Sequence, residues 1–282
     1  MGKLNALITV LKGLWVGGTM TVPGVSGGSM AMILGIYDKL ISSISNFFKQ
    51  PKKSIIFLAT FLIGAGAGMV LFSKYILMLI ENYPMPTRYF FLGAVVGGAP
   101  MIFRASKTKK VSWKTFLYLV IGVVCVLLIA QLPEGLFAPQ EKLTFGGVIL
   151  QLVGGLIVAI GLVLPGISVS QMLLMMGLYE FIMQSVSTLN VLPLIPLAVG
   201  IVGGIFLTTK LLENFMQNYP QATYLIVFGF LIGSVPELFP GFPTGWQIPL
   251  SILTAALGFL GVYYITRKEA QREAKEAQKT EE

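Results

Sequence analysis

Apolar runs of membrane-spanning length, separated by short polar loops, follow one another along most of the sequence. A helix that crosses a bilayer needs about 20 mainly apolar residues. The pattern predicts an all-α polytopic membrane protein. Its six complete spans are expected at about residues 54–80, 88–103, 115–132, 191–212, 222–239 and 248–266.

Two further apolar segments, about 4–48 and 145–186, are broken by loops that cannot continue a helix. The loops read Pro23-Gly24-Val25-Ser26-Gly27-Gly28-Ser29 and Pro165-Gly166-Ile167-Ser168-Val169-Ser170. Each segment is either two complete spans or a re-entrant hairpin whose tip stops near mid-membrane. The tips are small and uncharged, which favours the hairpin. Irregular backbone at that depth is tolerated where it is buried in protein or lines a wet cavity.

The two halves of the chain repeat each other. A shift of 142 positions places Pro23, Ser26 and Asp38 on Pro165, Ser168 and Glu180. Further along, a shift of 136 places Gly93 on Gly229 and Asn82-Tyr83-Pro84 on Asn218-Tyr219-Pro220. So many collinear matches indicate a duplication. The repeats are predicted at 1–132 and 133–266, followed by a charged cytoplasmic tail at 267–282.

Three complete spans per half is an odd number, so the second repeat is expected to be inverted. The distribution of basic residues tests the orientation. With both termini in the cytoplasm, 17 of the 20 Lys and Arg residues lie inside, and only Lys74, Arg88 and Lys142 lie outside. The expected location is therefore a plasma membrane, crossed several times.

Composition removes several function classes. Charged residues make up 11% of the chain, against roughly 25% in soluble domains. The net charge of +8 is spread over short loops, so nucleic acid is not an expected partner. The chain has no histidine, and Cys125 is its one cysteine, so neither a metal site, a cofactor nor an internal disulfide is expected.

Inverted repeats with broken helices are typical of secondary transporters, whose substrate site lies near the midplane. Backbone N–H groups that follow each Pro-Gly turn have no helical acceptor and favour an anion. The expected contacts to an oxyanion, such as the head of a phosphate or a carboxylate, are Ser26, Gly27, Gly28, Ser29, Ser168, Ser170, Arg88 and Lys74, and the residues that shape the loops are Pro23, Gly24, Pro165 and Gly166. In the competing interpretation, the loops only break and cap helices.

Other polar residues have two interpretations each. Lys74 could snorkel and Arg88 could anchor an interface, or both could contact phosphate. Asp38 and Glu180 are candidates for ion coupling, with protons as the candidate ion, or they lie at the membrane rims. The pairs Gly64/Gly68, Gly93/Gly97, Gly200/Gly204 and Gly229/Gly233 have the spacing of close helix packing and are expected to be structural.

The two Pro-Gly-[Val/Ile]-Ser loops, each followed by Gly-x-Tyr-[Asp/Glu], resemble those of the bacterial polyprenyl-phosphate transporter family. The resemblance extends over about residues 4–266. It implies a flippase that returns undecaprenyl phosphate, or a similar polyprenyl phosphate, from the outer to the cytoplasmic leaflet. Such recycling of the carrier lipid serves cell-envelope synthesis. The second loop departs from the first, with Val169 at the position of Gly27.

An undecaprenyl-diphosphate phosphatase is the main alternative, because those enzymes also combine inverted repeats with a Pro-Gly-x-Ser loop. Their loop carries an arginine where this chain has Gly27, and they use a glutamate cluster that this sequence lacks. A phosphate-transfer site here would have no charge stabiliser and no acid or base. We therefore expect no enzymatic activity. A small-anion transporter or channel also remains an alternative, and the sequence leaves the oligomeric state open.

Overall fold

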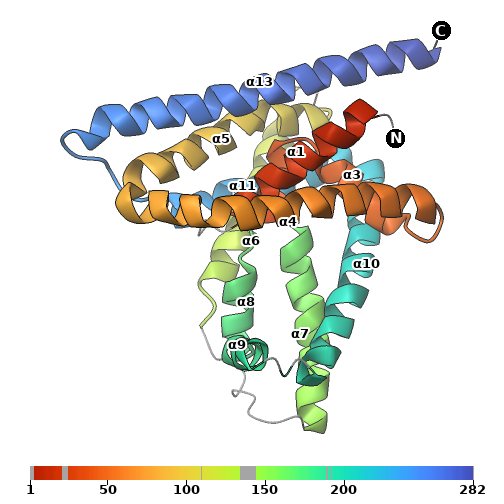
Figure 1. Ribbon diagram of the computed structural model, residues 1–282. Coiled ribbons are helices and arrows are strands. Elements are labelled where there is room, and N and C mark those ends of the chain that lie inside the picture. Colours follow the sequence, from red (N-terminus) through yellow and green to blue (C-terminus); the bar gives the residue numbers. More distant parts are fainter. Residues whose placement is uncertain are drawn as a thin grey trace.

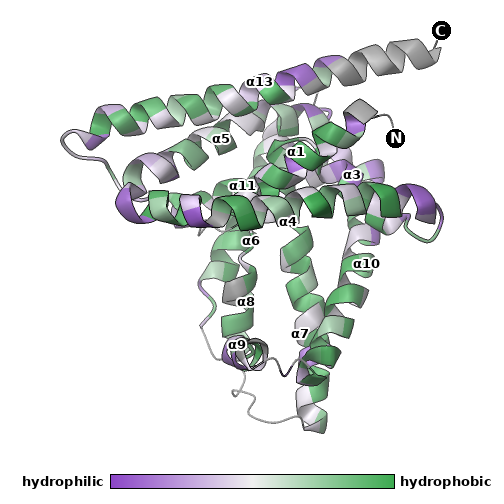
Figure 2. Ribbon diagram, viewed as in Figure 1, coloured by the Kyte–Doolittle hydropathy of each residue, from purple (hydrophilic) through white to green (hydrophobic). Residues whose placement is uncertain are grey.

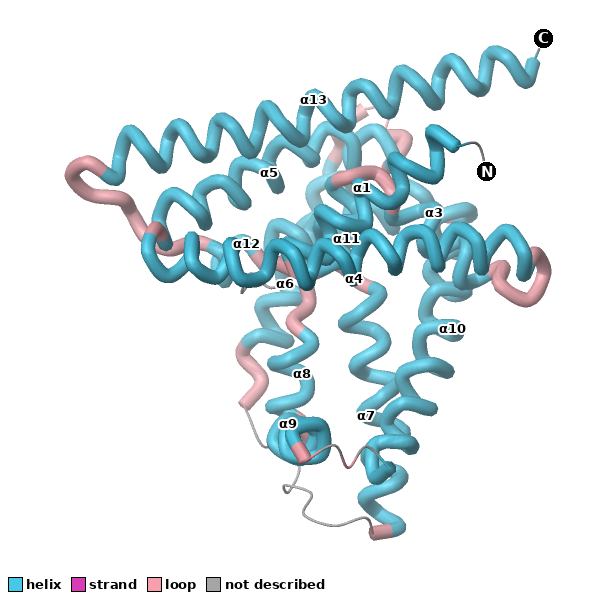
Figure 3. Tube along the Cα trace, viewed as in Figure 1, coloured by secondary structure: helices cyan, strands magenta, loops and turns pink. Residues whose placement is uncertain are grey.

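Helices are the only regular elements in the part of the chain that the structure describes (Figures 1 and 3). The computed structural model describes residues 3–20, 25–108, 110–133, 144–188, 190 and 192–281. The predicted all-helical class is confirmed. The helices are α1 (Lys3–Thr19), α2 (Gly27–Ile33), α3 (Tyr37–Ser45), α4 (Pro51–Asn82), α5 (Pro84–Ala105), α6 (Trp113–Ala130), α7 (Phe145–Val163), α8 (Val169–Met175), α9 (Tyr179–Ser187), α10 (Ile195–Asn218), α11 (Pro220–Gly233), α12 (Val235–Leu238) and α13 (Gln247–Glu281), with a 3₁₀ turn at Leu192–Leu194.

Six segments are long and apolar enough to cross a membrane, which makes the chain a multi-pass membrane protein. Five coincide with predicted spans. The sixth is α7, which the sequence placed in the first arm of a hairpin, and α5 is not in the set. The cause is composition, since α5 contains Arg88, Arg104 and Pro100 whereas α7 carries no charged residue. The six segments are Pro51–Phe72, Trp113–Ala130, Phe145–Val163, Leu192–Asn218, Pro220–Leu238 and Gln247–Lys268.

The outward surface of these helices is apolar. Green residues cover the long helices in Figure 2, and purple ones gather near their ends and in the loops. On α4, Leu62, Ile63 and Val70 are 64%, 69% and 79% exposed. In water this surface would be costly, whereas lipid tails solvate it.

Each broken segment consists of one long helix followed by two short ones. In the first half α1 precedes α2 and α3, and in the second half α7 precedes α8 and α9. The short helices meet at Gly35 and Gly177, whose φ angles are +66° and +63°, a conformation that glycine adopts without steric cost. Both α2 and α8 have seven residues, or about 10 Å of helix at 1.5 Å per residue. Neither crosses a hydrocarbon core about 30 Å thick.

Glycines allow the long helices to pack in closely spaced pairs. A Cβ atom at Gly64 of α4 would meet the carbonyl oxygen of Val10 on α1, and one at Gly200 of α10 would meet that of Leu152 on α7. The two contacts correspond under the shifts that relate the repeats. The structural role predicted for the glycine pairs is confirmed.

The remaining long helices exchange partners between the halves. A Cβ atom at Gly93 of α5 would meet the carbonyl oxygen of Ala255 on α13, and one at Gly229 of α11 would meet that of Leu119 on α6. Thus α5 pairs with the last helix of the second half, and α11 pairs with the last helix of the first. In Figure 1, α1, α4, α5 and α13 run across the view, and α7 and α10 extend downward from this layer.

Candidate functional site

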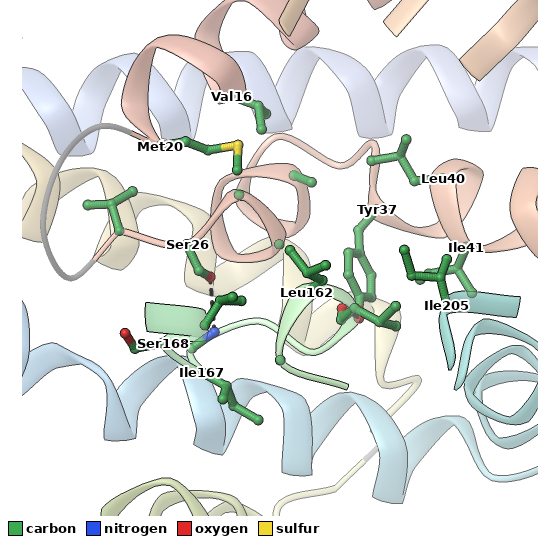
Figure 4. A pocket seen from close by; sticks show the side chains of 18 of the residues that line it. Val16, Met20, Ser26, Tyr37, Leu40, Ile41, Leu162, Ile167, Ser168 and Ile205 are labelled. Atoms are coloured by element: carbon green, nitrogen blue, oxygen red, sulfur yellow. Dashed lines mark hydrogen bonds between the residues drawn. The ribbon is translucent and has the colours of Figure 1, made fainter. Parts of the chain in front are cut away.

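A cavity of about 1150 Å³ lies where the two broken segments meet (Figure 4). The first half contributes the end of α1, residues 25–28, α3 and part of α4. The second half contributes the end of α7, residues 166–169, α10 and the α11–α12 junction. The prediction that both Pro-Gly loops face one site therefore agrees with where their described residues lie.

A direct hydrogen bond joins the two loops. The N–H of Gly166 donates to the Ser26 Oγ over 3.1 Å, the dashed line in Figure 4. The same oxygen accepts the Ser29 N–H at 3.1 Å and lies 2.6 Å from the Ser29 Oγ. Ser26 is also the N-cap of α2. One hydroxyl thus caps a helix of the first half and holds the loop of the second.

The loop contact leaves little space for additional atoms. A Cβ atom at Gly28 would lie 3.3 Å from the Cα of Pro165, so the backbone of the second loop would have to shift by a few tenths of an ångström. Gly166 has a φ of +83°, and a Cβ atom there would meet the Phe230 carbonyl oxygen. At Gly27 the neighbour is the sulfur of Met20, at 2.9 Å, which is the movable end of a side chain.

Two hydrogen bonds tie the start of α3 to the second half. The buried Tyr37 donates from its hydroxyl to the carbonyl oxygen of Val163 over 2.7 Å, just before the second loop. Next to it, the Asp38 Oδ2 accepts a 2.6 Å hydrogen bond from the Tyr224 hydroxyl on α11. Both bonds connect residues far apart in the sequence, so α3 moves only if these contacts break or α11 and the second loop move with it.

The cavity walls are mainly apolar, with polar groups confined to a few places. Leu62 and Leu162 line it and are also exposed, at 64% and 41%, so the lining continues onto the outer surface. Thr209 and Ser234 use their hydroxyls on carbonyl oxygens of their own helices. Glu237 contributes a carboxylate, and none of the described lining residues is Lys or Arg.

The structure separates the predicted site residues into groups. Ser26, Gly27, Gly28, Gly166 and Ser168 line the cavity, whereas Ser29 and Pro165 lie buried behind it. Pro23, Gly24 and the side chain of Ser170 lie outside the described residues. Four further predicted residues also lie outside the cavity lining, namely Lys74 on α4, Arg88 on α5, Asp38 on α3 and Glu180 on α9.

Glu237 is the lining residue that the sequence analysis missed. A carboxylate between apolar runs is a recognised sign of function in membrane helices, and Glu237 follows Pro236 at the end of one. Its counterpart in the first half, under the shift of 136, is Met101. Because the first half has no carboxylate at the matching position, the repeat pattern gives no signal for Glu237.

Fold and cavity together define a multi-pass helical membrane protein with an interior site to which both halves contribute. Residues 16–248 match the model of the undecaprenyl phosphate translocase-like family. The chain belongs to that family. The predicted resemblance is confirmed, and with it the expectation of a transporter rather than an enzyme.

Two curated relatives carry the name polyprenyl-phosphate transporter. One, from Staphylococcus aureus, is 31% identical over 279 residues, covering 94% of this chain and 98% of the relative. The other, from Vibrio cholerae, is 30% identical over 260 residues, covering 87% and 82%. No solved structure matches.

Proposed function

We propose that this protein is a flippase that returns undecaprenyl phosphate, or a similar polyprenyl phosphate, from the outer to the cytoplasmic leaflet of a bacterial inner membrane. The recovered carrier lipid would re-enter cell-envelope synthesis. The observation that carries the proposal is the cavity at the loop contact, which has polar loop atoms at one place and apolar walls that reach the lipid-facing surface.

A polyprenyl phosphate needs both parts of such a cavity. Its charged head cannot cross hydrocarbon without polar partners, whereas its tail is most stable in lipid. Ligand pockets usually measure about 300–1000 Å³, and this one, at about 1150 Å³, has room for the head and the first isoprenes. The exposed side chains of Leu62 and Leu162 mark where the tail would leave the cavity.

The head would be held by neutral donors. The N–H groups of Gly27 and Gly28 begin α2, and the hydroxyl of Ser168 lies beside them on the cavity wall. Ser26 would act through the loop contact, because its oxygen accepts two N–H groups and lies 2.6 Å from the Ser29 Oγ. Since α2 has only seven residues, its macrodipole adds little. Neutral donors hold an anion less tightly than Lys or Arg would, which suits a substrate that must be released. Ser29 and Ser170 would support these donors, and Arg88 and Lys74 would contact the head on its way in.

An inverted repeat would give the site access from both leaflets. We assign the first repeat, 1–132, and the second, 133–266, to opposite orientations, with re-entrant hairpins at about 4–48 and 145–186 and both termini in the cytoplasm. The hairpin in each half is supported by the contact register, because α1 and α4 run parallel, and so do α7 and α10. A chain that crosses in one direction along α1 and again in the same direction along α4 must turn back between them, and the same holds for α7 and α10.

Leaflet exchange in proteoliposomes tests the function. Purified protein should move a fluorescent short-chain polyprenyl phosphate between leaflets faster than protein-free vesicles do. Ser26→Ala should slow exchange, because the buried Gly166 N–H loses its acceptor, a loss that costs about 1–3 kcal/mol. Ser26→Thr keeps a hydroxyl and serves as the matched control.

The alternatives predict different results in the same vesicles. Release of inorganic phosphate from undecaprenyl diphosphate at an enzyme-like rate would mean a phosphatase. Flux of inorganic phosphate without exchange of the lipid would mean a small-anion transporter. Either result contradicts the proposed function.

A further inference from the structure

The residues of the Asp38–Tyr224 hydrogen bond have counterparts at matching positions of the other half, but within the described residues the structure forms no bond between those counterparts. The shift of 142 that places Tyr37 on Tyr179 also places Asp38 on Glu180. The shift of 136 that places Tyr83 on Tyr219 and Gly93 on Gly229 also places Arg88 on Tyr224. The residues that correspond to this carboxylate–tyrosine pair are therefore a carboxylate and an arginine, Glu180 and Arg88.

Glu180 and Arg88 are not paired in this structure. Glu180 is exposed on α9, and no ion pair joins it to Arg88 among the described residues. The Arg88 Nε is buried and has no hydrogen-bond partner in the part of the chain that the structure describes. A buried guanidinium nitrogen without an acceptor costs free energy, so this conformation leaves Arg88 in need of an anionic partner.

The halves also differ in how their short helices pack. In the first half, α3 lies against α10, with a hydrogen bond from the Asn46 Nδ2 to the Glu213 Oε1 over 2.9 Å. The corresponding helix of the second half, α9, makes no comparable contact with α4 among the described residues. Two copies of one motif therefore adopt two arrangements in the same molecule.

We infer that Arg88 and Glu180 form an ion pair in a second conformation of the protein, in which the two halves exchange these arrangements. In that conformation Glu180 takes the place of Asp38, Arg88 takes the place of Tyr224, and the Asp38–Tyr224 bond is open. The inference rests on the proposed inverted repeat, in which exchange of the two arrangements converts access from one side into access from the other.

The chemistry of the pair gives it a role in release of the substrate. In the present conformation the Arg88 Nε–H has no acceptor among the described residues and could donate to a phosphate oxygen. In the second conformation the Glu180 carboxylate occupies the same fork, since carboxylate and phosphate match a guanidinium in the same bidentate way. Phosphate and Glu180 then compete for one side chain, and pairing with Glu180 excludes phosphate from Arg88.

Cross-linking tests the pair without relying on transport. In a Cys125→Ser background, one double variant carries Arg88→Cys with Glu180→Cys, and the control carries Asp38→Cys with Tyr224→Cys. A short bifunctional thiol reagent should link both pairs in membranes. Linking of the control pair alone overturns the inference, because Arg88 and Glu180 then never meet.

A charge exchange adds an independent readout. Arg88→Glu and Glu180→Arg should each lower the rate of leaflet exchange at least tenfold, and the double variant should recover a substantial part of it. No recovery in a double variant that is as thermally stable as wild type overturns the inference. If the proposed function is wrong, the wild-type protein will show no lipid exchange. The cross-linking experiment does not measure transport, so it still tests the ion pair in that case.

Discussion

The close approach of the two loops depends on single residues that have no side chain. Gly28 faces the backbone of Pro165, whereas Gly27 faces only the flexible end of Met20. The two glycines are adjacent and equally small, but the neighbour of Gly27 is the end of a flexible side chain, whereas the neighbour of Gly28 is backbone. The loop contact is therefore sensitive at one position and tolerant at the next.

Gly28→Val is expected to disrupt the site more than Gly27→Val. Extra methyl groups against backbone force a shift that typically costs about 1–3 kcal/mol. We expect Gly28→Val to weaken binding of a polyprenyl phosphate by roughly tenfold or more, equivalent to about 1.4 kcal/mol. Binding and thermal stability should be measured on both purified variants. If Gly28→Val is folded and binds as wild type does, the loops are only helix breaks.

Glu237→Gln is expected to strengthen binding of the phosphate head. Glu237 lines the cavity, where no described lining residue carries positive charge. Two anions in one mainly apolar cavity repel each other. Removing the charge should tighten binding at neutral pH by roughly three- to tenfold, or about 0.7–1.4 kcal/mol.

The pH dependence of phosphate binding should change when Glu237 is replaced by glutamine. Wild-type affinity should rise as the pH falls, because protonation of Glu237 removes the repulsion, and Glu237→Gln should lack that part of the rise. Glu81→Gln is the control, since Glu81 is exposed at the end of α4 and does not line the cavity. Equal affinities of wild type and Glu237→Gln at every pH would mean that Glu237 lies outside the field of the bound phosphate.

Among the elements, the α5–α13 pair offers a direct comparison of two glycines on one helix. A Cβ atom at Gly258 would meet the Phe90 carbonyl oxygen, and one at Gly261 would have no atom within 4 Å. Gly258→Ala should therefore force the helices apart and lower the free energy of unfolding by roughly 1–3 kcal/mol. Gly261→Ala should be neutral or raise it by up to about 1 kcal/mol, because alanine is the better helix former.

Thermal melts of the two purified variants in detergent measure the difference. Equal melting temperatures of the two variants would contradict the close packing of Gly258 of α13 against α5.

The sequence identified the packing surfaces of the helices but not their partners. The four-residue spacing of Gly93 and Gly97 is enough to predict a flat surface for a neighbouring helix. It says nothing about which helix covers that surface, because almost any apolar helix with its own small residues fits. The exchange of α13 and α6 between the halves became visible only from the structure.

For the molecule as a whole, the topology is the main prediction that a labelling experiment can test. In a Cys125→Ser background, Glu81→Cys and Trp246→Cys should react with an impermeant maleimide in intact cells, because both positions are expected outside. Lys52→Cys and Arg267→Cys should react only after permeabilisation. Reaction of Trp246→Cys from the inside alone would mean that the second repeat is not inverted.

The centre of the site could be predicted because the proposed duplication places its motif twice in the sequence. Ser26 and Ser168 fall at equivalent positions of the two repeats, and the structure brings both to one cavity. Groups present in only one half gave no such signal. Glu237 lines the cavity although its counterpart is Met101, and Arg88 lies outside the lining although its charge drew attention. Whether such a residue lines the cavity depends on how the helices pack in three dimensions, which the repeat pattern alone does not specify.

The exchange of helix partners has a consequence for biosynthesis. As the chain emerges from the ribosome, α5 enters the membrane long before α13, the helix that covers its glycines, has been translated. Until then the Gly93 surface faces lipid or a chaperone of the insertion machinery. The first half cannot complete its packing alone, since α6 also waits for α11. Quality control of this protein must therefore tolerate a half-made molecule whose helix surfaces stay open until the final span arrives.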